Sequence, residues 1–392
     1  MTSPPRDLDI ILFGATGFTG GLTAAYLAAH APAGLRWALA GRSPDRLAAL
    51  RDRLGVDVAT LAADVEDPDS LGRLAASARV VATTVGPYVR YGEPLVAACA
   101  REGTGYLDLS GEPEFVDRMY LRHHATAEKT GARLVHACGF DSVPHDLGAQ
   151  FTVERLPAGA PIVLRGYVTA SGLPSGGTFE SAVTGLARYR HAAAAHRERR
   201  AAEPRRTGRR VRALPGRPGY HRELEAWVFP LPTIDPQIVL RSAWALDRYG
   251  PDFAYGHFGA VRSPLVVAGL AVGVAGTFAL AQLPPTRDLL LRLRPPGAGP
   301  DPERRAKSWF RVTFFGDSDG HRVTTEVAGG DPGYDETAKM LAEAAMCLAT
   351  DRLPETAGQV TTAVAMGPVL RIRLERAGIT FRVVEKPGPA SA

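Results

Sequence analysis

The sequence predicts an α/β protein in which a doubly wound parallel sheet is followed by a second, α+β domain. Short apolar segments alternate with segments of helical composition six times over about the first 140 residues. These apolar segments are typical of parallel strands that helices cover on both faces. A glycine-rich turn, GATGFTG at residues 14–20, joins the first apolar segment to the first helical one. The alternation stops near Asp146, where we expect the second domain to begin.

Each unit of the first domain pairs one short strand with one helix. The strands are expected at residues 8–13, 36–43, 58–65, 79–88, 105–111 and 132–142. The helices between them are expected at residues 21–32, 44–55, 67–78, 94–103 and 112–131. Because the strands are separated by helices, they can run parallel in one sheet, as in dinucleotide-binding folds of the Rossmann type.

The pattern of the second half is mixed. Residues 161–171 predict a strand, residues 179–196 a helix, and residues 308–330 a hairpin around the turn GDSDG. Residues 336–351 predict an amphipathic helix, and the arginine-rich segment 197–222 is expected to be a mobile loop. We therefore expect a nucleotide-binding domain at 1–146, a substrate and oligomerisation domain at 147–332, and a C-terminal helical return at 333–392.

Composition and charge exclude several classes of protein. The three cysteines are far apart, which predicts neither a disulfide framework nor a metal cluster and favours a reducing cytoplasm. The N-terminus has no charged-then-apolar pattern, so no signal peptide is expected. The net charge of +5 arises from segment 197–222, which alone carries +8. The remainder is mildly acidic, and this argues against nucleic-acid binding.

The glycine turn predicts a phosphate-binding loop. Gly14, Gly17 and Gly20 are spaced so that the backbone can turn tightly and approach a pyrophosphate at the start of a helix. The alternative is a glycine turn that binds no ligand. The residues expected to bind the cofactor here are Gly14, Ala15, Thr16, Gly17, Phe18, Thr19 and Gly20.

The end of the second strand indicates NADPH rather than NADH. An NAD enzyme normally has an acidic residue there, whereas this chain has Arg42 and Ser43, which can bind a 2′-phosphate. Asp64 lies at the end of the third strand and could contact the adenine or cap the next helix. The end of the fourth strand is expected near the nicotinamide and contains Val85, Gly86 and Pro87.

The chain resembles the saccharopine dehydrogenase-like oxidoreductases, and within them the trans-acting enoyl reductases of bacterial lipid and polyketide pathways. The resemblance spans nearly the whole chain, and its most specific stretches are TVGPYVRYGE and GFDSVPHDLG. Further matching stretches are GATGFTG, AGRS, GTGYLDLSGE, SGGTFES, GGDPGYDETAKMLAEAAMCLA and TAVAMGPVL. It implies an NADP-binding domain, a second domain for substrate, and a C-terminal helix that returns to the first domain. It also implies reduction of a carbon–carbon double bond in an acyl or polyketide chain, alongside a synthase.

Such a reduction needs a hydrogen-bond donor for the developing oxyanion and a proton for the α-carbon. Tyr88 is the first candidate, although it could instead be an aromatic shelf beside the nicotinamide. Asp141 is the second, although it could instead cap the following helix. His145 is a weaker candidate, and Asp108 and Glu112 are expected to hold loops together. No histidine spacing indicates a metal site, so none is expected.

Residues 263–285 form an apolar segment inside a run of 24 uncharged residues, long enough to span a bilayer. The alternatives are a shallow membrane contact, a helix that lines an apolar substrate channel, and a subunit contact in a homodimer. All of them fit a hydrophobic acyl substrate. The arginine-rich segment could be a solvated loop, a docking site for an acidic carrier protein, or a contact with anionic lipids.

Two other functions remain open at this level. One is an imine or carbonyl reductase that acts on a smaller substrate, as the parent family name suggests. The other is a non-catalytic, membrane-associated protein that keeps a nucleotide-binding fold. The apolar segment counts against a small polar substrate, and the intact glycine turn counts against loss of nucleotide binding.

Overall fold

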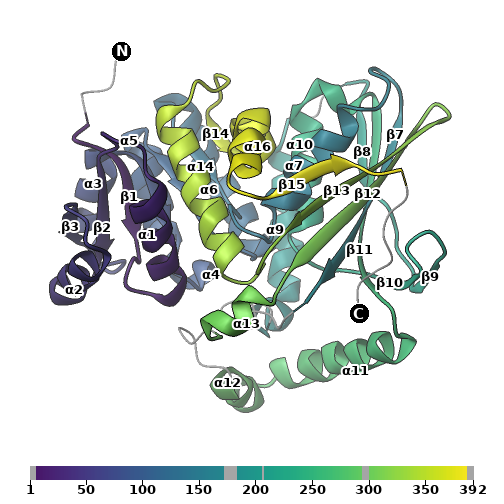
Figure 1. Cartoon of the computed structure of the whole chain (residues 1–392), viewed down its shortest axis with the longest axis horizontal. Coiled ribbons are helices and arrows are strands. Elements are labelled where there is room, and N and C mark those ends of the chain that lie inside the picture. Colours follow the sequence, from purple (N-terminus) through teal and green to yellow (C-terminus); the bar gives the residue numbers. More distant parts are fainter. Residues whose placement is uncertain (1–5, 172–182, 205–206, 294–299, 386–392) are drawn as a thin grey trace.

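Two β-sheets side by side form the frame of the molecule (Figure 1). The computed structural model describes residues 6–171, 183–204, 207–293 and 300–385. The stretch SGGTFES, one of those that carry the family resemblance, lies outside these residues. Helix α7, Val143–Val153, follows the sixth strand along the chain and packs on the second sheet. It therefore joins the two sheets.

The first sheet is parallel throughout, as predicted. Among the described residues its strand order is β14-β6-β5-β4-β1-β2-β3, the order expected of a dinucleotide-binding fold with one extra strand. Its strands are β1 Leu8–Phe13, β2 Trp37–Gly41, β3 Ala59–Ala62, β4 Ala78–Thr83, β5 Gly105–Leu107, β6 Arg133–Val135 and β14 Gly358–Val360. The predicted strands are therefore confirmed, and the first has the predicted bounds; the other five end earlier because residues after them form loops at the carboxyl edge of the sheet.

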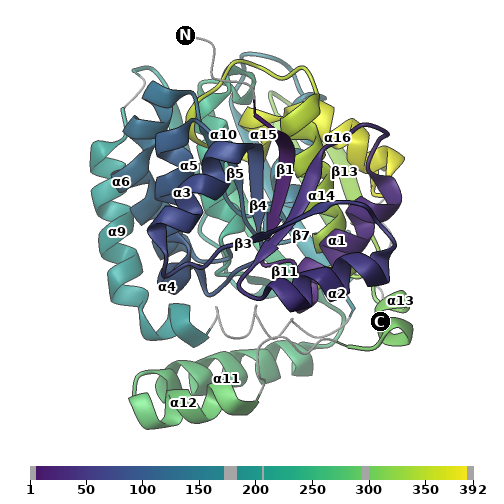
Figure 2. The ribbon, with the colours of Figure 1, turned by 90° about the vertical axis from the view of Figure 1, so that its left-hand side faces the viewer.

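Helices cover both faces of this sheet, because β1 buries alternate side chains on opposite faces. Ile10 and Leu12 belong to one hydrophobic core, and Ile11 and Phe13 to the other. Figure 2 shows the two layers on either side of the strands. The helices are α1 Phe18–His30, α2 Pro44–Leu54, α3 Pro68–Ser77, α4 Tyr88–Tyr91, α5 Glu93–Glu102 and α6 Pro113–Thr130.

The second sheet is mixed. In the described chain its order is β15-β13-β12-β7-β11-β10-β9, and β8 pairs with the other half of β11. Its strands are β7 Ile162–Ala170, β8 Arg210–Ala213, β9 Gly219–His221, β10 Ala226–Pro230, β11 Asp252–Val261, β12 Phe310–Ser318, β13 His321–Gly329 and β15 Thr380–Val383. The predicted hairpin is confirmed: Asp319 and Gly320 have φ of 45° and 78°, as a two-residue turn between twisted strands requires.

The remaining helices connect and flank the sheets. They are α9 Tyr189–Ala202, α10 Asp235–Ala245, η1 Asp247–Tyr249, α11 Pro264–Ala281, α12 Pro284–Leu293, α13 Pro302–Ala306, α14 Asp335–Thr350, α15 Thr362–Ala365 and α16 Gly367–Arg376. The C-terminal part of the chain contributes to both sheets. Helix α14 packs on α1 and β4, and β14 joins the first sheet, whereas β15 pairs with β13 in the second.

The prediction of a mobile arginine-rich loop is wrong for the described residues of that segment. Part of segment 197–222 belongs to α9, β8 and β9. Arg199 is 3% exposed and pairs with Asp117 of α6 and Glu203. Arginine composition alone predicted a solvated segment, but Asp117 of the distant helix α6 and Glu203 of the segment itself pair with Arg199 and allow it to be buried.

The apolar segment forms α11, and this helix lies on the surface. Leu265 is 81% exposed and Val272 is 74% exposed, so these side chains face away from the body of the protein. A Cβ atom on any of its three glycines would meet no atom within 4 Å. It is the one described helix long and apolar enough to cross a membrane. Figure 2 shows α11 and α12 beside each other, below the body of the protein.

Candidate functional site

The glycine turn between β1 and α1 brings backbone against backbone. Gly14 has φ of +84°, a conformation that favours glycine, and its amide hydrogen bonds to Ala40 of the neighbouring strand. A Cβ on Gly20 would lie 2.2 Å from the carbonyl oxygen of Gly14, so only glycine lets the helix approach the turn this closely. The Gly17 amide donates to the same carbonyl oxygen at 3.0 Å, and α1 begins directly afterwards. The N-terminus of α1 is thus open toward the turn.

A groove of about 530 Å³ lies at the carboxyl edge of the first sheet, above this turn. Eight of the residues predicted to bind the cofactor line it: Gly14, Thr16, Gly17, Arg42, Ser43, Asp64, Val85 and Gly86. The groove is also lined by residues that no sequence motif indicated, namely Phe13, Gly41, Arg46, Val65, Glu66, Thr84 and Tyr91. Five of them end a strand or lie in the loop after one, whereas Arg46 is on α2 and Tyr91 is on α4.

Five other residues predicted to contact the cofactor lie beside the groove and do not line it. Ala15 is buried, and Phe18 packs edge-on against Tyr334 with a ring distance of 4.9 Å. The carbonyl of Thr19 accepts a hydrogen bond from Thr23. Gly20 sets the packing distance of α1, and Pro87 precedes α4.

One end of the groove is basic. Arg42 is exposed and makes no ion pair or hydrogen bond with the described part of the chain, so its guanidinium is available to an anion. The Ser43 hydroxyl caps α2 by accepting from the Arg46 amide at 3.4 Å, and it can still donate its own proton. The Arg46 guanidinium donates to the carbonyl of Thr16 at 3.3 Å and adds a second positive charge. Two arginines at the end of β2 fit a 2′-phosphate.

Asp64 lies in the groove rather than at the helix cap. Its carboxylate accepts a hydrogen bond from the Glu66 amide at 3.1 Å, which folds the loop after β3. The cap of α3 is Asp67, whose side chain accepts from the Asp69 and Ser70 amides. Of the two roles left open for Asp64, capping is therefore performed by another residue.

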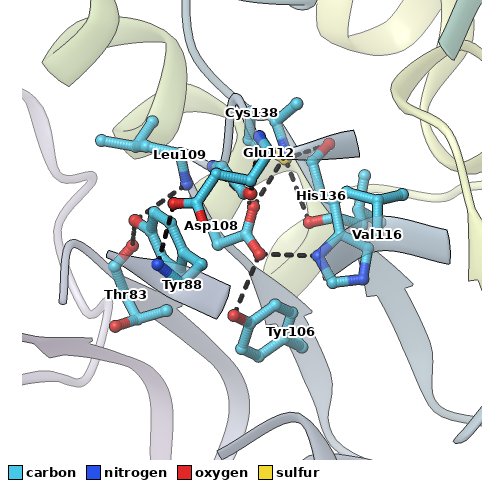
Figure 3. A network of polar contacts seen from close by, with 12 residues as sticks. Thr83, Tyr88, Tyr106, Asp108, Leu109, Glu112, Val116, His136 and Cys138 are labelled. Atoms are coloured by element: carbon cyan, nitrogen blue, oxygen red, sulfur yellow. Dashed lines mark hydrogen bonds and ion pairs between the residues drawn. The ribbon is translucent and has the colours of Figure 1, made fainter. Parts of the chain in front are cut away.

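The hydroxyl of Tyr88 is held inside the protein. It donates to the carbonyl of Thr83 at 3.1 Å and accepts from the Leu109 amide at 3.1 Å (Figure 3). The ring is 6% exposed, and burial, followed by the nearby charge of Asp108, raises the pKa of Tyr88 well above its usual value. Tyr91, one turn of helix further on, is the tyrosine that lines the groove.

Asp108 is the centre of a buried network at the ends of β5 and β6 (Figure 3). One carboxylate oxygen accepts from the Tyr106 hydroxyl at 3.0 Å and from His136 at 2.6 Å. The other accepts from the Ser110 and Ala137 amides at 3.0 and 2.9 Å. Four donors thus satisfy this carboxylate.

The carboxylate of Glu112 is bound to the amides that start α4, those of Tyr88 and Val89, at 2.9 and 2.8 Å. Together with the contacts of Asp108, these bonds fix the loops that border the groove. The expectation that Asp108 and Glu112 hold loops together is confirmed.

Asp141 follows β6 in the loop before α7, whose N-cap position is taken by Ser142. Its Oδ2 atom would lie 3.1 Å from a Cβ on Gly111, so the loops after β5 and β6 meet at this carboxyl group. Burial raises the pKa of Asp141 to about 6. A carboxyl group with that pKa can hold a proton at pH values where an ordinary aspartate cannot.

A glycine turn at a strand–helix junction, a groove at the carboxyl edge of a parallel sheet and a basic end define a dinucleotide-binding protein of the Rossmann class. Residues 10–135 match the family described as the saccharopine dehydrogenase NADP binding domain. This match covers the strands and helices that build the groove.

Relatives extend the similarity to the full length. A protein of Mycobacterium ulcerans named trans-acting enoyl reductase is 35% identical, with 97% of this chain and 98% of the relative aligned. A Mycobacterium tuberculosis protein that carries this name provisionally is 41% identical, with 97% and 99% aligned. The chain therefore belongs to the trans-acting enoyl reductase family, and its N-terminal part is an NADP-binding domain.

Among solved structures, saccharopine dehydrogenase (L-Glu forming) from Saccharomyces cerevisiae is similar in fold. It superposes with a TM-score of 0.55 over 96% of this chain and 99% of the yeast chain, at 13% identity. At that identity the similarity concerns the two-domain architecture and carries nothing about substrate.

Proposed function

We propose that this protein is an NADPH-dependent reductase that saturates an activated carbon–carbon double bond in a hydrophobic acyl or polyketide chain, in trans to a synthase. The observation that carries the proposal is the combination of an intact, basic-ended dinucleotide groove with full-length similarity to proteins named trans-acting enoyl reductases. The fold alone would not choose this reaction, because related folds serve many chemistries.

The residues of the groove have distinct roles in this proposal. The glycine turn and the open amides of α1 bind the pyrophosphate, and Arg42 with Arg46 binds the 2′-phosphate. The loop Val85–Gly86 borders the nicotinamide end. When bound, the reduced cofactor supplies the hydride that reaches the β-carbon of the substrate.

The two candidate catalytic residues differ in what their surroundings allow. The hydroxyl of Tyr88 already makes two hydrogen bonds with the backbone, which favours a role in holding β4 against the loop after β5. Asp141 does not line the groove itself, but it lies in the loop after β6, beside Gly111 of the loop after β5, and burial raises its pKa to about 6. Its place beside these loops and its raised pKa make it the better candidate to deliver the proton to the α-carbon. We propose Asp141 for this role.

A binding experiment tests the cofactor assignment. Purified protein is titrated with NADPH and with NADH while nicotinamide fluorescence is followed. We expect tighter binding of NADPH, and Arg42→Gln should weaken NADPH binding by about 10-fold, the loss of one charge-assisted contact, and leave NADH unchanged. Arg53→Gln, an exposed arginine of helix α2 outside the groove, is the matched control. If neither dinucleotide binds, the proposed function is wrong.

A product experiment tests the reaction. The protein is incubated with enoyl thioesters and NADPH deuterated at the transferred position, and the products are analysed by mass spectrometry. Deuterium at the β-carbon is the expected result. Transfer to an imine or carbonyl carbon instead would establish the alternative reductase and contradict enoyl reduction. Asp141→Asn should lower kcat by about 10²-fold or more if it is the proton donor.

We also propose that helix α11 makes a shallow contact with a lipid surface while the body stays in the cytoplasm. The helix carries no charged residue, and it exposes large apolar side chains, among them Leu265, Val272 and Phe278. β11 before the helix and α13 beyond α12 both belong to the protein body, which favours a helix lying along the surface of a membrane over one that crosses it. Such a contact would bring the enzyme to hydrophobic chains.

Flotation with phospholipid vesicles tests this contact. The wild-type protein should float, and Leu265→Glu with Val272→Glu should abolish flotation. Ile372→Glu is the control, because Ile372 is an exposed apolar residue on α16, 40% accessible. Light scattering without vesicles measures the oligomeric state and tests the alternative that α11 is a subunit contact. That alternative holds if the wild type does not float and the glutamate variant is a monomer where the wild type is a dimer.

A further inference from the structure

Three buried polar side chains from separate elements meet between the two sheets. His145 lies in the first turn of α7, Asp235 begins α10, and His257 is in the middle of β11. They are 2%, 3% and 6% exposed. None lines the dinucleotide groove, although Asp235 is near enough to Asp141 for the two carboxyl groups to interact.

The facing atoms of the cluster lack ordinary hydrogen-bond partners. Within the described part of the chain, His145 Nδ1, Asp235 Oδ1 and His257 Nε2 are buried and make no hydrogen bond. His145 Nδ1 lies 3.4 Å from Asp235 Oδ1, and His257 Nε2 lies 3.5 Å from Asp235 Oδ2. Charge-assisted hydrogen bonds are shorter, about 2.7–2.9 Å. Buried polar atoms without partners are uncommon and indicate that something else completes the site.

The spacing of these atoms fits a tetrahedral metal ion. With metal–ligand distances of about 2.0–2.2 Å, neighbouring ligand atoms of a tetrahedron lie roughly 3.3–3.6 Å apart. The two histidines approach opposite oxygens of Asp235 at distances of this size, so one imidazole or the carboxyl group must turn before a single Asp235 oxygen and both nitrogens surround one ion. One ligand atom from each residue lies within 4.8 Å of the other two, close enough for one ion to reach all three after small side-chain rotations. Two imidazoles and one carboxylate are a donor set that zinc prefers.

The surroundings also suit a cation. The Nδ1 atom of His257 lies 3.0 Å from the Tyr255 hydroxyl, a second contact that fixes the ring with Nε2 toward Asp235.

We propose that His145, Asp235 and His257 form a three-ligand binding site for a transition-metal dication of the zinc class. The ion would connect α7, which follows the first sheet, to α10 and to the centre of the second sheet. This proposal goes beyond the reductase function and does not depend on it. No metal site is predicted from the sequence, because these ligands are 90 and 22 residues apart and form no motif.

Cobalt titration tests the site directly. Tag-free, full-length protein is treated with a chelator, exchanged into metal-free buffer and titrated with Co²⁺, whose tetrahedral complexes absorb strongly in the visible range. We expect one equivalent to bind with that absorption, and one equivalent of Zn²⁺ to abolish it. Elemental analysis of protein purified without chelator should give close to one metal ion per chain.

Variants assign the ligands. Asp235→Asn and His257→Gln should each lower the affinity for Co²⁺ by at least about 10-fold, as loss of one ligand does. His321→Gln, an exposed histidine after the β12–β13 turn, should bind Co²⁺ as the wild type does. NADPH binding, measured on every variant, reports that each one is folded and keeps this test separate from that of the reductase function. Absence of the absorption in wild type, or its retention in Asp235→Asn, would overturn the proposal.

Discussion

Two buried aspartates show how differently this protein treats carboxyl groups in its interior. Asp108, at the end of β5, accepts four hydrogen bonds from side chains and amides of the first domain. Asp235, at the start of α10, faces two imidazoles at 3.4 and 3.5 Å, and its Oδ1 atom makes no hydrogen bond within the described residues. The folded chain supplies hydrogen-bond donors to both oxygens of Asp108. It leaves Asp235 Oδ1 without a donor, so this atom can still bind a ligand.

The hydrogen-bond partners of the buried polar atoms therefore distinguish a structural network from a binding site. A satisfied network stabilises the loops around it and gains nothing from a ligand. An unsatisfied cluster lowers the stability of the folded protein until something binds there. Substitutions at the two aspartates should therefore have effects of different size, and the cluster should respond to metal while the network should not.

The largest effect is expected for Asp108→Ala. Removing this carboxylate leaves four buried donors without an acceptor, so the free energy of unfolding should fall by about 3–5 kcal/mol. Urea unfolding followed by circular dichroism measures it. Asp52→Ala, an exposed aspartate of α2 paired with Arg51, is the control and should change stability by less than about 0.5 kcal/mol. A loss at Asp108 as small as that of the control would refute the structural role of the network.

A smaller effect is expected for Tyr88→Phe, which removes two backbone hydrogen bonds and should cost about 1–2 kcal/mol. Because the pKa of Tyr88 is raised in the folded protein, the unfolded chain loses this proton first as the pH rises above about 10. Stability should therefore fall with rising pH in this range, and the fall should be less steep in Tyr88→Phe than in wild type.

Urea titrations at several alkaline pH values measure this slope, with the 54% exposed Tyr220 replaced by Phe as the control. Turnover separates the two roles of Tyr88. If Tyr88→Phe keeps its stability but loses most of its kcat, the hydroxyl is catalytic and the structural interpretation of its contacts is incorrect.

The smallest effect is expected for Asp235→Asn in metal-free protein. Burial already disfavours the charged form of this carboxyl group, and its Oδ1 atom accepts no hydrogen bond, so stability should change by less than about 1 kcal/mol. Adding Zn²⁺ should raise the melting temperature of the wild type and leave Asp235→Asn unchanged. Destabilisation as large as that of Asp108→Ala would remove the contrast between the two carboxylates.

Much of the fold and of the dinucleotide groove could be predicted from short stretches of sequence. The turn GATGFTG, Arg42, Ser43 and the end of the fourth strand are contiguous motifs, and the parallel sheet places the carboxyl ends of its strands at one edge. Arg46 was not predicted to bind the cofactor. It lies in the first turn of α2, four residues after Arg42, and this position could have indicated its role.

Other features could not be predicted because their partners are distant in the chain. The arginine-rich segment looked solvated until α6 supplied Asp117 to pair with the buried Arg199. Tyr88 looked available to a substrate until the Leu109 amide, 21 residues further on, was found to bind its hydroxyl. Nothing local in the sequence reports these contacts.

The sequence by itself determined the alternation of strands and helices, the phosphate-binding turn and the apolar composition of α11, because each depends on residues a few positions apart. Only the tertiary structure decided that α11 lies exposed on the surface and that His145, Asp235 and His257 meet. Burial and the approach of side chains from three separate elements are properties of the packed chain. They arise when α7 and α10 pack together and α10 packs on β11 of the second sheet.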